Sequence, residues 1–296
     1  MDVKLIGAGA VGLSVANKLL KHSELTIIVD DERRARYSSG LKYNGRMIEL
    51  PFATDSKTDL LIVAVKNFHL EGVIDLIGRY ISDETVILPL LNGIDSERVL
   101  SRAFGSEKVL YGFITDLSAN HQEMETVCFS DGGTIVFGEK DNRKSERVLK
   151  ISKLFDISSQ RYRIADDIMH EKWWKFMLNT CFNTLSAILE AAYSDISGNR
   201  DFIRLVRIVA KEVQAVATSE GILITSDDID RMISTVTRLT DSGQTSMLQD
   251  VLAHRQTENE YFAGAVSRLG KMHGVDTQIC DFVNIMLEVK RYVYNR

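Results

Sequence analysis

Proline is almost absent from this sequence. Only 2 of its 296 residues are proline, Pro51 and Pro89, against 19 glycines. An interior proline kinks or breaks a helix, so a chain with so few prolines can form long uninterrupted helices. Both prolines lie in the first third of the chain, which leaves the second half free for helices of any length.

Cysteine is scarce as well. The three cysteines, Cys128, Cys181 and Cys280, are far apart, and no Cys-x-x-Cys pair occurs. An odd, scattered set of this kind excludes a disulfide framework and a cysteine-based zinc site. We predict three buried free thiols in a reducing compartment, and no metal site.

Neither a strong charge nor a long apolar run is present. Lys and Arg number 36 against 41 Asp and Glu, a net charge of −5, which gives no sequence-wide attraction for nucleic acid or anionic membranes. No apolar stretch reaches the roughly 18 residues of a membrane span, and the first residues do not resemble a signal peptide. We therefore expect a cytoplasmic protein with no nucleic-acid or membrane partner. At about 150 residues per domain, 296 residues make about two domains.

The first half alternates short apolar runs with amphipathic stretches. Runs in which apolar residues are nearly continuous indicate strands of a parallel sheet covered on both faces, the doubly wound, Rossmann-type α/β fold. Two turn signals predict antiparallel hairpins, Asn44-Gly45 between Leu41 and Leu50, and Gly132-Gly133 between 126–129 and 134–137. The predicted strands of the parallel sheet are residues 3–6, 25–29, 59–65, 86–88 and 109–111.

From residue 166 onward we find no convincing strand. Apolar residues recur at helical spacing instead. We place the boundary near Ala165, with a dinucleotide-binding Rossmann domain at 1–165 and an all-helical domain for substrate and dimerisation at 166–296. The expected helices are 142–155 before the boundary and, after it, 167–190, 200–220, 226–238 and 258–290, the last broken at Gly274.

A glycine-rich loop follows the first strand and opens a helix. Its sequence, Gly7-Ala8-Gly9-Ala10-Val11-Gly12, matches GxGxxG. Gly7 allows a tight turn, Gly9 allows close approach to a pyrophosphate, and Gly12 allows the helix to pack on the strand. The position directly after a strand favours dinucleotide binding by the whole loop over a merely structural turn.

An acidic residue, Asp30, ends the second strand, 23 positions after Gly7. An acid at this distance binds the adenosine ribose diol and favours NADH. Arg33 and Arg34 follow closely, and an arginine there would favour the 2′-phosphate of NADPH. We expect NADH.

Polar residues interrupt the predicted helix 167–190. Lys175, Asn179 and Asn183 recur at i, i+4 and i+8 and share one face. The lysine is a candidate proton donor or oxyanion partner, and the two amides could orient a ligand. A solvated surface stripe is the alternative.

Four further positions are candidates. Glu258 extends the apolar face of a helix that we expect to start near Thr257, where its carboxylate is either a substrate ligand or a charge favourable to the helix dipole. Ser246 opens the polar run that precedes it. Lys66 and Asn92 follow apolar strands, at the carboxyl ends where open α/β sheets bind ligands, or else are ordinary loop residues.

These residues together resemble the ketopantoate reductase family, the 2-dehydropantoate 2-reductases, over nearly the whole chain. The run from Ser246 to Asp250, followed eight residues later by Glu258, is the most family-specific motif. The resemblance also rests on the glycine loop, Val65-Lys66, Asn92-Gly93, Lys175 with Asn179, and Thr257-Glu258.

The resemblance implies a residue-by-residue assignment. The match to Lys175 protonates the forming alkoxide, and the match to Glu258 holds the substrate hydroxyl. The matches to Asn92, Asn179 and Ser246 bind substrate, with Asn183 beside them on the same stripe. Lys66 lies near the nicotinamide, and Asn92 near the cofactor as well. Family members pair a Rossmann domain with a helical domain, usually use NADPH, and are often dimers.

The sequence departs from the family at three places. Leu91 stands where many members have Gln, and Asp30 stands where Arg is common. Thr184 follows Asn183 at a position where many members have Pro after the Asn. Our first hypothesis is a reductase of a 2-keto acid, converting 2-dehydropantoate to (R)-pantoate in pantothenate biosynthesis. The alternative within the family is an NAD-dependent D-2-hydroxyacid dehydrogenase of the mandelate type. The alternative from another class is a non-catalytic NAD(P)-sensing protein.

Overall fold

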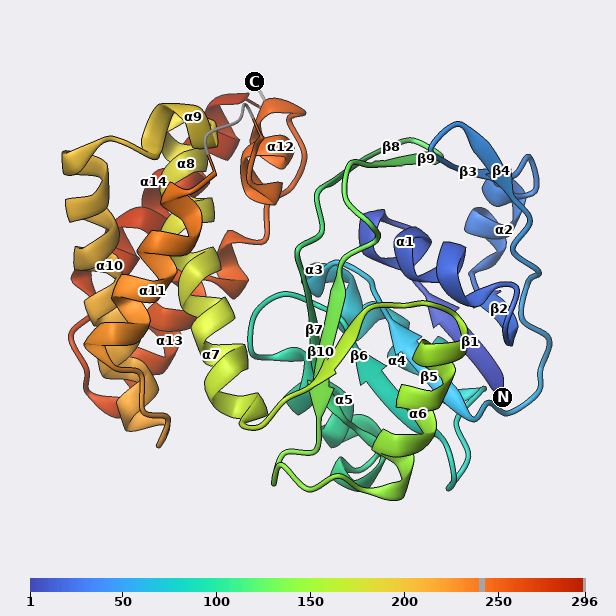
Figure 1. Cartoon of the computed structure of the whole chain (residues 1–296). Helices are drawn as coiled ribbons and strands as arrows, with labels where there is room; N and C mark the ends of the chain where they lie inside the picture. The colour runs from blue at the N-terminus through green and yellow to red at the C-terminus, as the bar shows by residue number, and fades with distance from the viewer. Residues whose placement is uncertain (240–242, 295–296) are drawn as a thin grey trace. The chain divides into compact units, whose positions relative to one another are not determined.

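The chain, described for residues 1–239 and 243–294 by a computed structural model, forms two compact units, Met1–Ile168 and Met169–Arg296. All strands of the described residues lie in the first unit, and the described part of the second contains only helices and loops (Figure 1). This order confirms the predicted fold class, an α/β sheet followed by an all-helical region.

A four-stranded parallel sheet forms the centre of the N-terminal unit, in the order β2-β1-β5-β6. Its strands are β1 (Asp2–Ile6), β2 (Glu24–Ile28), β5 (Leu60–Val63) and β6 (Val86–Pro89). Of the predicted strand at 109–111, Val109 forms one parallel bridge with Ile87, and Tyr111 begins a strand of another sheet. The helical elements of this unit are α1 (Ala10–Leu19), α2 (Asp31–Tyr37), α3 (Asn67–Leu70), η1 (Glu71–Val73), α4 (Ile74–Gly78), α5 (Ser96–Phe104), η2 (Ser106–Lys108) and α6 (Glu146–Ile157).

Both faces of this sheet are buried, as the continuous apolar strands predict. Val3 and Leu5 of β1 join one apolar cluster with side chains of α1 and α6. Ile6 joins a second cluster with side chains of α3, α4 and α5. Successive strand residues point to opposite faces, so each strand needs apolar residues at consecutive positions to cover both.

Two smaller sheets complete this unit. One has the order β11-β10-β7 and the other β4-β3-β9-β8. The Asn44-Gly45 hairpin is confirmed, with both residues at positive φ between the antiparallel strands β3 and β4. The strands are β3 (Leu41–Tyr43), β4 (Arg46–Ile48), β7 (Tyr111–Thr115), β8 (Ala119–Gln122), β9 (Glu125–Cys128), β10 (Thr134–Gly138) and β11 (Tyr162–Ile164).

The second predicted hairpin is wrong. β9 pairs with β3 and β8, whereas β10 pairs with β7 and β11, so Gly132 and Gly133 join two different sheets. Burial decides the outcome: Ile135 and Phe137 of β10 are fully buried in the cluster that covers the parallel sheet. Pairing of β10 with β7 places these two side chains in that cluster. The local turn sequence carries no information about this burial.

The helical unit follows most of the predicted stretches. Gly274 ends α13 in the left-handed conformation, at φ 68°, and so confirms the expected break. The long predicted helix at 167–190 has a π-helical turn, η3, in its middle. The elements are α7 (Ile168–Leu178), η3 (Asn179–Asn183), α8 (Thr184–Leu189), α9 (Tyr193–Ile196), α10 (Arg200–Ser219), α11 (Ser226–Thr237), α12 (Ser246–Leu252), η4 (Asn259–Tyr261), α13 (Ala263–His273) and α14 (Gln278–Tyr294).

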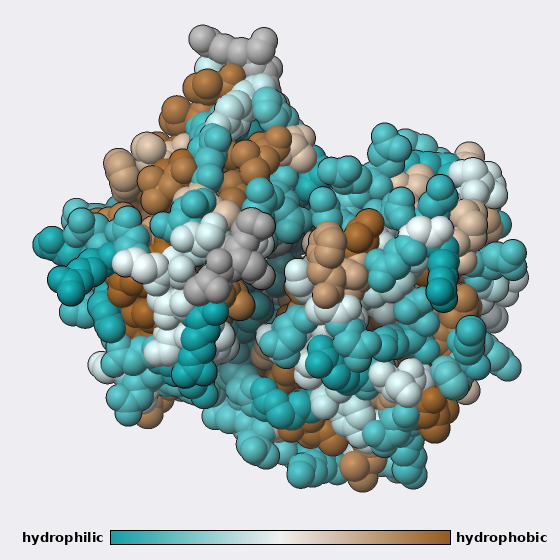
Figure 2. All heavy atoms as spheres, turned by 45° about the horizontal axis from the view of Figure 1, so that its top comes forward, coloured by the Kyte–Doolittle hydropathy of each residue, from teal (hydrophilic) through white to brown (hydrophobic). Residues whose placement is uncertain are grey.

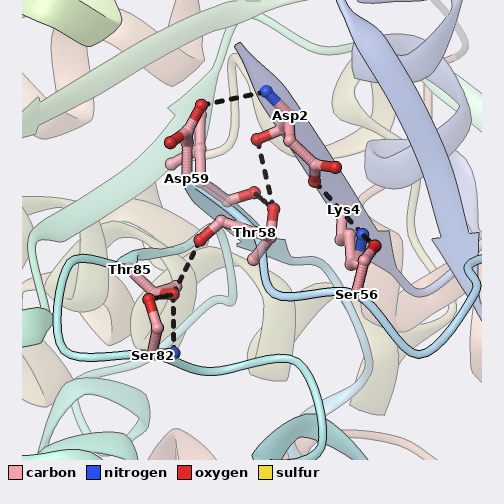
Figure 3. A network of polar contacts seen from close by, with 8 residues as sticks. Asp2, Lys4, Ser56, Thr58, Asp59, Ser82 and Thr85 are labelled. Carbon is pink, nitrogen blue, oxygen red and sulfur yellow. Dashed lines mark hydrogen bonds and ion pairs between the residues drawn. The ribbon is translucent and has the colours of Figure 1, made fainter.

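A polar network closes the amino end of the parallel sheet (Figure 3). Lys4 of β1 is only 1% exposed, and its ammonium group lies 3.1 Å from both the Asp2 carboxylate and the Ser56 hydroxyl. The Asp2 amide donates to Asp59, and Thr58 accepts from Thr85. The polar groups at this edge therefore bond to one another, and the candidate residues of this unit follow the opposite, carboxyl ends of the strands.

All three cysteines are free and buried, as predicted. No helix in residues 1–239 and 243–294 is long and apolar enough to cross a membrane. The surface is mixed: Figure 2 shows hydrophobic side chains exposed between hydrophilic ones.

Candidate functional site

The glycine loop joins β1 to α1, and its packing explains two of its three glycines. Gly7 has a φ of 103°, and a Cβ there would lie 2.4 Å from the carbonyl oxygen of Ala64. A Cβ on Gly12 would lie 1.8 Å from the carbonyl oxygen of Gly7. A side chain at either position would therefore force backbone apart.

Gly9 differs from these two glycines. It has an ordinary φ of −80°, and a Cβ there would meet nothing within 4 Å. Packing does not explain a glycine at this position, so the open side of the loop is available to a ligand. Gly9 is also the N-cap of α1 and provides no side-chain cap, which leaves amide N–H groups of the first turn for an anion. The loop thus fits a pyrophosphate, the group that the sequence predicts here.

Asp30 follows β2 and begins α2. Its Oδ1 accepts the Arg33 amide at 2.7 Å as the N-cap of that helix, and its Oδ2 pairs with the Arg33 guanidinium. A carboxylate has about four acceptor positions, so these contacts leave capacity for a ribose diol. The Arg34 guanidinium lies 4.8 Å from the centre of the Phe52 ring. The two arginines that complicate the cofactor prediction thus have partners within the protein.

The loops after β5 and β6 are tied together by a residue that sequence reasoning missed. Asn67, only 3% exposed, donates from Nδ2 to the backbone carbonyl of Asn92 at 2.9 Å. This bond joins the turn of Lys66, which precedes α3, to the turn of Asn92, and both of those residues are half-buried. The sequence signal for this residue was its position, since Asn67 directly follows the candidate Lys66. Leu91 is buried in an apolar cluster and presents no polar group.

In the helical unit, Lys175, Asn179 and Asn183 occupy one continuous helical run with a change of pitch. In an α helix, two steps of four residues would carry Asn183 about 80° around the axis from Lys175. The turn from Asn179 to Asn183 is π-helical. Because an i→i+5 turn holds more residues than an α turn, the second step rotates back and brings Asn183 toward the Lys175 side.

The burial of this run contradicts a solvated surface stripe. Asn179 and Asn183 are 3% and 5% exposed, and Lys175 is half-buried. The Thr184 hydroxyl donates to the carbonyl of Thr180, a bond that a proline at that position could not make. The departure at Thr184 therefore stabilises the π turn.

Ser246, at the start of α12, joins this run. The Asn183 Nδ2 donates to the Ser246 hydroxyl over 3.3 Å. The preceding residue, Thr245, caps α12 and shares a 2.7 Å hydrogen bond with Ser186 of α8. Two residues that the sequence predicts as substrate ligands, 63 positions apart, are thus in direct contact.

Glu258 is buried, but its backbone setting differs from the expectation. The predicted helix from Thr257 is wrong: Glu258 precedes the short turn η4, and α13 begins only at Ala263. Phe262 lies between them at φ −118° and ψ −95°, outside the helical region. The fully buried Asn259 bonds to Asn284 of α14 and holds η4 against that helix. Glu258, 5% exposed, is therefore positioned by tertiary contacts and not by helical phase.

The orientation of α7 is set by the start of α11. The indole Nε1 of Trp174 donates to the Asp228 carbonyl at 3.0 Å, and His170 is hydrogen-bonded to the Asp228 carboxylate at 3.1 Å. Burial opposes the charge on Asp228, but hydrogen bonds from Thr225 and His170 hold its pKa below the usual value. Trp174, the residue next to Lys175, is thus held by the main chain at Asp228, and His170, one turn earlier, is held by the ionised Asp228 carboxylate.

Comparison with known proteins shows the family to which the chain is similar. The family model described as ketopantoate reductase PanE/ApbA matches residues 3–142, and the model for the C-terminal part of the same enzymes matches residues 167–291. A 2-dehydropantoate 2-reductase of Lactococcus lactis subsp. lactis (strain IL1403) is 26% identical over 310 residues, covering 98% of each chain.

Solved structures share the whole fold. A D-mandelate dehydrogenase, bound to NADH and anilino(oxo)acetate, is 26% identical and covers 100% of both chains with a TM-score of 0.90. A 2-dehydropantoate 2-reductase from Geobacter metallireducens GS-15 has a TM-score of 0.85 at 24% identity and covers 97% of this chain and 99% of that one.

Proposed function

Because this chain belongs to the ketopantoate reductase family, we propose that it is an NAD(P)H-dependent oxidoreductase that reduces 2-dehydropantoate to (R)-pantoate, a step of pantothenate biosynthesis. One observation carries the proposal: the buried amides of Asn179 and Asn183 continue the helical run of Lys175, and Asn183 contacts Ser246. A lysine beside buried amides and a hydroxyl can bind a 2-keto acid and protonate its reduced oxygen.

The two units have different roles in this proposal. The N-terminal unit, predicted as 1–165, binds the dinucleotide through Gly7-Ala8-Gly9-Ala10-Val11-Gly12 and Asp30, with Lys66 and Asn92 toward the reacting end. The helical unit, predicted as 166–296, binds the keto acid. When bound, the nicotinamide supplies the hydride. Supporting this assignment, Gly9 is the one of the three loop glycines at which an added Cβ would meet nothing, and the pyrophosphate would approach there.

Lys175 donates the proton. As the ketone is reduced, negative charge develops on its oxygen, and the ammonium group stabilises that charge before transferring a proton to it. An interaction that strengthens in the transition state raises kcat. Asn179, Asn183 and Ser246 orient the carboxylate and ketone, and Glu258 accepts a hydrogen bond from the substrate hydroxyl.

A second candidate is an NAD-dependent D-2-hydroxyacid dehydrogenase. It is favoured by the shared fold and 26% identity with a D-mandelate dehydrogenase that binds NADH. Asp30 and the buried Leu91, where many ketopantoate reductases have glutamine, agree with this reading.

A steady-state assay separates these candidates. Oxidation of NADH and of NADPH is followed with ketopantoate, 2-ketoisovalerate and phenylglyoxylate. We expect the highest kcat/KM with ketopantoate. A preference for phenylglyoxylate would instead establish the mandelate-type activity. Tight cofactor binding without turnover of any keto acid would identify the non-catalytic sensor.

We expect NADH to be preferred over NADPH by at least about tenfold in kcat/KM, because the Asp30 carboxylate binds the ribose diol and repels a 2′-phosphate. In the Asp30→Asn variant this ratio falls at least about tenfold. Asparagine is as good an N-cap as aspartate, so α2 keeps its cap and the variant tests the charge alone. NADPH binding tenfold more tightly than NADH to the unmodified protein would overturn the role of Asp30.

Replacing Glu258 with glutamine or alanine should raise KM for ketopantoate about 10- to 100-fold, the cost of a lost hydrogen bond to a charged group. The matched control is a second substrate, 2-ketoisovalerate, which lacks the hydroxyl and should keep its KM in the same variants. Equal losses with both substrates would show that Glu258 supports the fold and does not contact the substrate hydroxyl.

We further propose that the enzyme works in the cytoplasm as a homodimer. The family resemblance implies a dimer, and the charge balance favours no nucleic-acid or membrane partner.

A further inference from the structure

The strand order of the parallel sheet decides which end of a dinucleotide each loop can reach. Asp30 follows β2, the glycine loop follows β1, and Lys66 and Asn92 follow β5 and β6. Since the sheet runs β2-β1-β5-β6, these loops come one after another in that order. A Cβ on Gly7 would lie 2.4 Å from the Ala64 carbonyl oxygen, so the glycine loop touches the end of β5 directly. A dinucleotide with its ribose at Asp30 and its pyrophosphate at the glycine loop would therefore have its nicotinamide end near Lys66 and Asn92.

Asn67 connects the two loops at this nicotinamide end. It is the first residue of α3, directly after Lys66, and is only 3% exposed. Its Nδ2 donates to the backbone carbonyl of Asn92 at 2.9 Å, across 25 residues of chain. A buried amide needs a hydrogen-bond partner, but a bond within its own loop would meet that need equally well. The partner that Asn67 has instead belongs to the neighbouring loop, so this bond sets the separation between the two loops.

The turn that follows β6 is fixed at its two ends by other hydrogen bonds. Before the turn, the Leu90 amide donates to the Val63 carbonyl at 2.8 Å. After the turn, the carboxylate of Glu97, in the first turn of α5, accepts the Gly112 amide of β7 at 3.4 Å. Glu97 is 1% exposed, so this end of the turn is anchored inside the unit. Asn67 holds the stretch between these two anchors, where the candidate ligand side chain leaves the main chain.

We propose that Asn67 is a positioning residue for the nicotinamide end of the dinucleotide. Its bond to the main chain of Asn92 holds Lys66 and Asn92 at one separation, so that both side chains meet the bound cofactor without prior rearrangement of either loop. Asn67 itself makes no contact with the ligand in this role. The inference rests on the proposed dinucleotide function and deepens it. The adenosine end depends on Asp30 and the glycine loop, whereas the nicotinamide end depends on Asn67.

Asn67→Ala and Asn67→Leu should each weaken NADH binding about tenfold, the size expected when one hydrogen bond of this kind is lost. Leucine is close to asparagine in volume, so Asn67→Leu removes the donor without opening a cavity. The matched ligand is ADP-ribose, which contains the adenosine and the pyrophosphate but lacks the nicotinamide ring. Its affinity should change less than about twofold in both variants.

The measurement is the dissociation constant of each ligand by titration calorimetry, with circular dichroism to establish that each variant is folded. The control variant is Asn44→Ala, which removes another asparagine that bonds to main chain in the same unit. Its Oδ1 accepts the Cys128 amide at 2.7 Å. This variant should lower the melting temperature and change neither affinity, which separates a loss of stability from a loss of positioning.

Equal losses of NADH and ADP-ribose affinity in the two folded Asn67 variants would show that Asn67 has only a structural role. Unchanged NADH affinity would overturn the proposal as well. The readout is binding and not turnover, so it is independent of the substrate. An unmodified protein that reduces none of the keto acids, but whose Asn67 variants lose NADH affinity alone, would refute the proposed reaction and leave the role of Asn67 intact.

Discussion

Replacing Lys175 with alanine is expected to lower kcat by at least about 100-fold, the smaller end of the effect of a general acid. The variant loses both the proton and the positive charge that stabilises the forming alkoxide. Since the effect belongs to the transition state, KM should change far less than kcat. Single-turnover rates of NADH oxidation with saturating ketopantoate measure it directly.

Two controls separate chemistry from folding. Lys211→Ala removes an exposed lysine of α10 from the same unit and should retain the full rate. Lys175→Arg keeps the positive charge without a readily transferred proton. Its rate should therefore lie between the rate of Lys175→Ala and the rate of Lys211→Ala. Near-normal turnover in folded Lys175→Ala would remove Lys175 from the mechanism.

Gly9→Val is expected to weaken dinucleotide binding at least about 100-fold while leaving the melting temperature unchanged. The free energy lost corresponds to one or two charge-assisted hydrogen bonds from backbone N–H groups to the pyrophosphate. The fold should tolerate the change because a Cβ at Gly9 meets nothing within 4 Å and its φ of −80° suits any residue. Titration of the NADH fluorescence gives the dissociation constant.

Gly12→Ala is the matched comparison within the same loop. Its Cβ would lie 1.8 Å from the Gly7 carbonyl oxygen, so the backbone must move and the protein should lose about 3 kcal/mol of stability. Gly9→Val is thus expected to change the affinity for NADH, whereas Gly12→Ala is expected to change the stability of the fold. Unchanged NADH affinity in Gly9→Val would show that the loop is a structural turn and not a dinucleotide site.

The sequence predicted local features of the candidate site better than contacts between distant residues. The glycine loop lies within one β-strand, turn and helix, so its sequence neighbours are also its neighbours in space. Asn67 illustrates the limit of such local reasoning. It acts on Asn92, 25 residues away and on the next strand of the sheet, and only the parallel pairing of β5 and β6 brings the two together.

The stripe in the helical unit was predictable in its members but not in its form. The i, i+4, i+8 spacing identified Lys175, Asn179 and Asn183, whereas the π turn that realigns them left no periodic signal. The regular helix predicted from Thr257 through Phe262 is absent because a long-range contact, and not a local pattern, sets the backbone there. Asn259 bonds to Asn284 of α14, and this long-range contact competes with regular helix formation at 258–262.

The sequence by itself therefore determined the order and type of most elements, the parallel sheet and the position of the glycine loop, because periodicity and steric demand act over a few residues. The scarcity of proline contributed, because a second half without proline can be helical throughout. Only the tertiary structure decided which partner β10 takes, how Glu258 is buried, and that Ser246 meets Asn183. Each of these depends on burial against residues distant in the chain, and a local pattern does not specify what it will pack against.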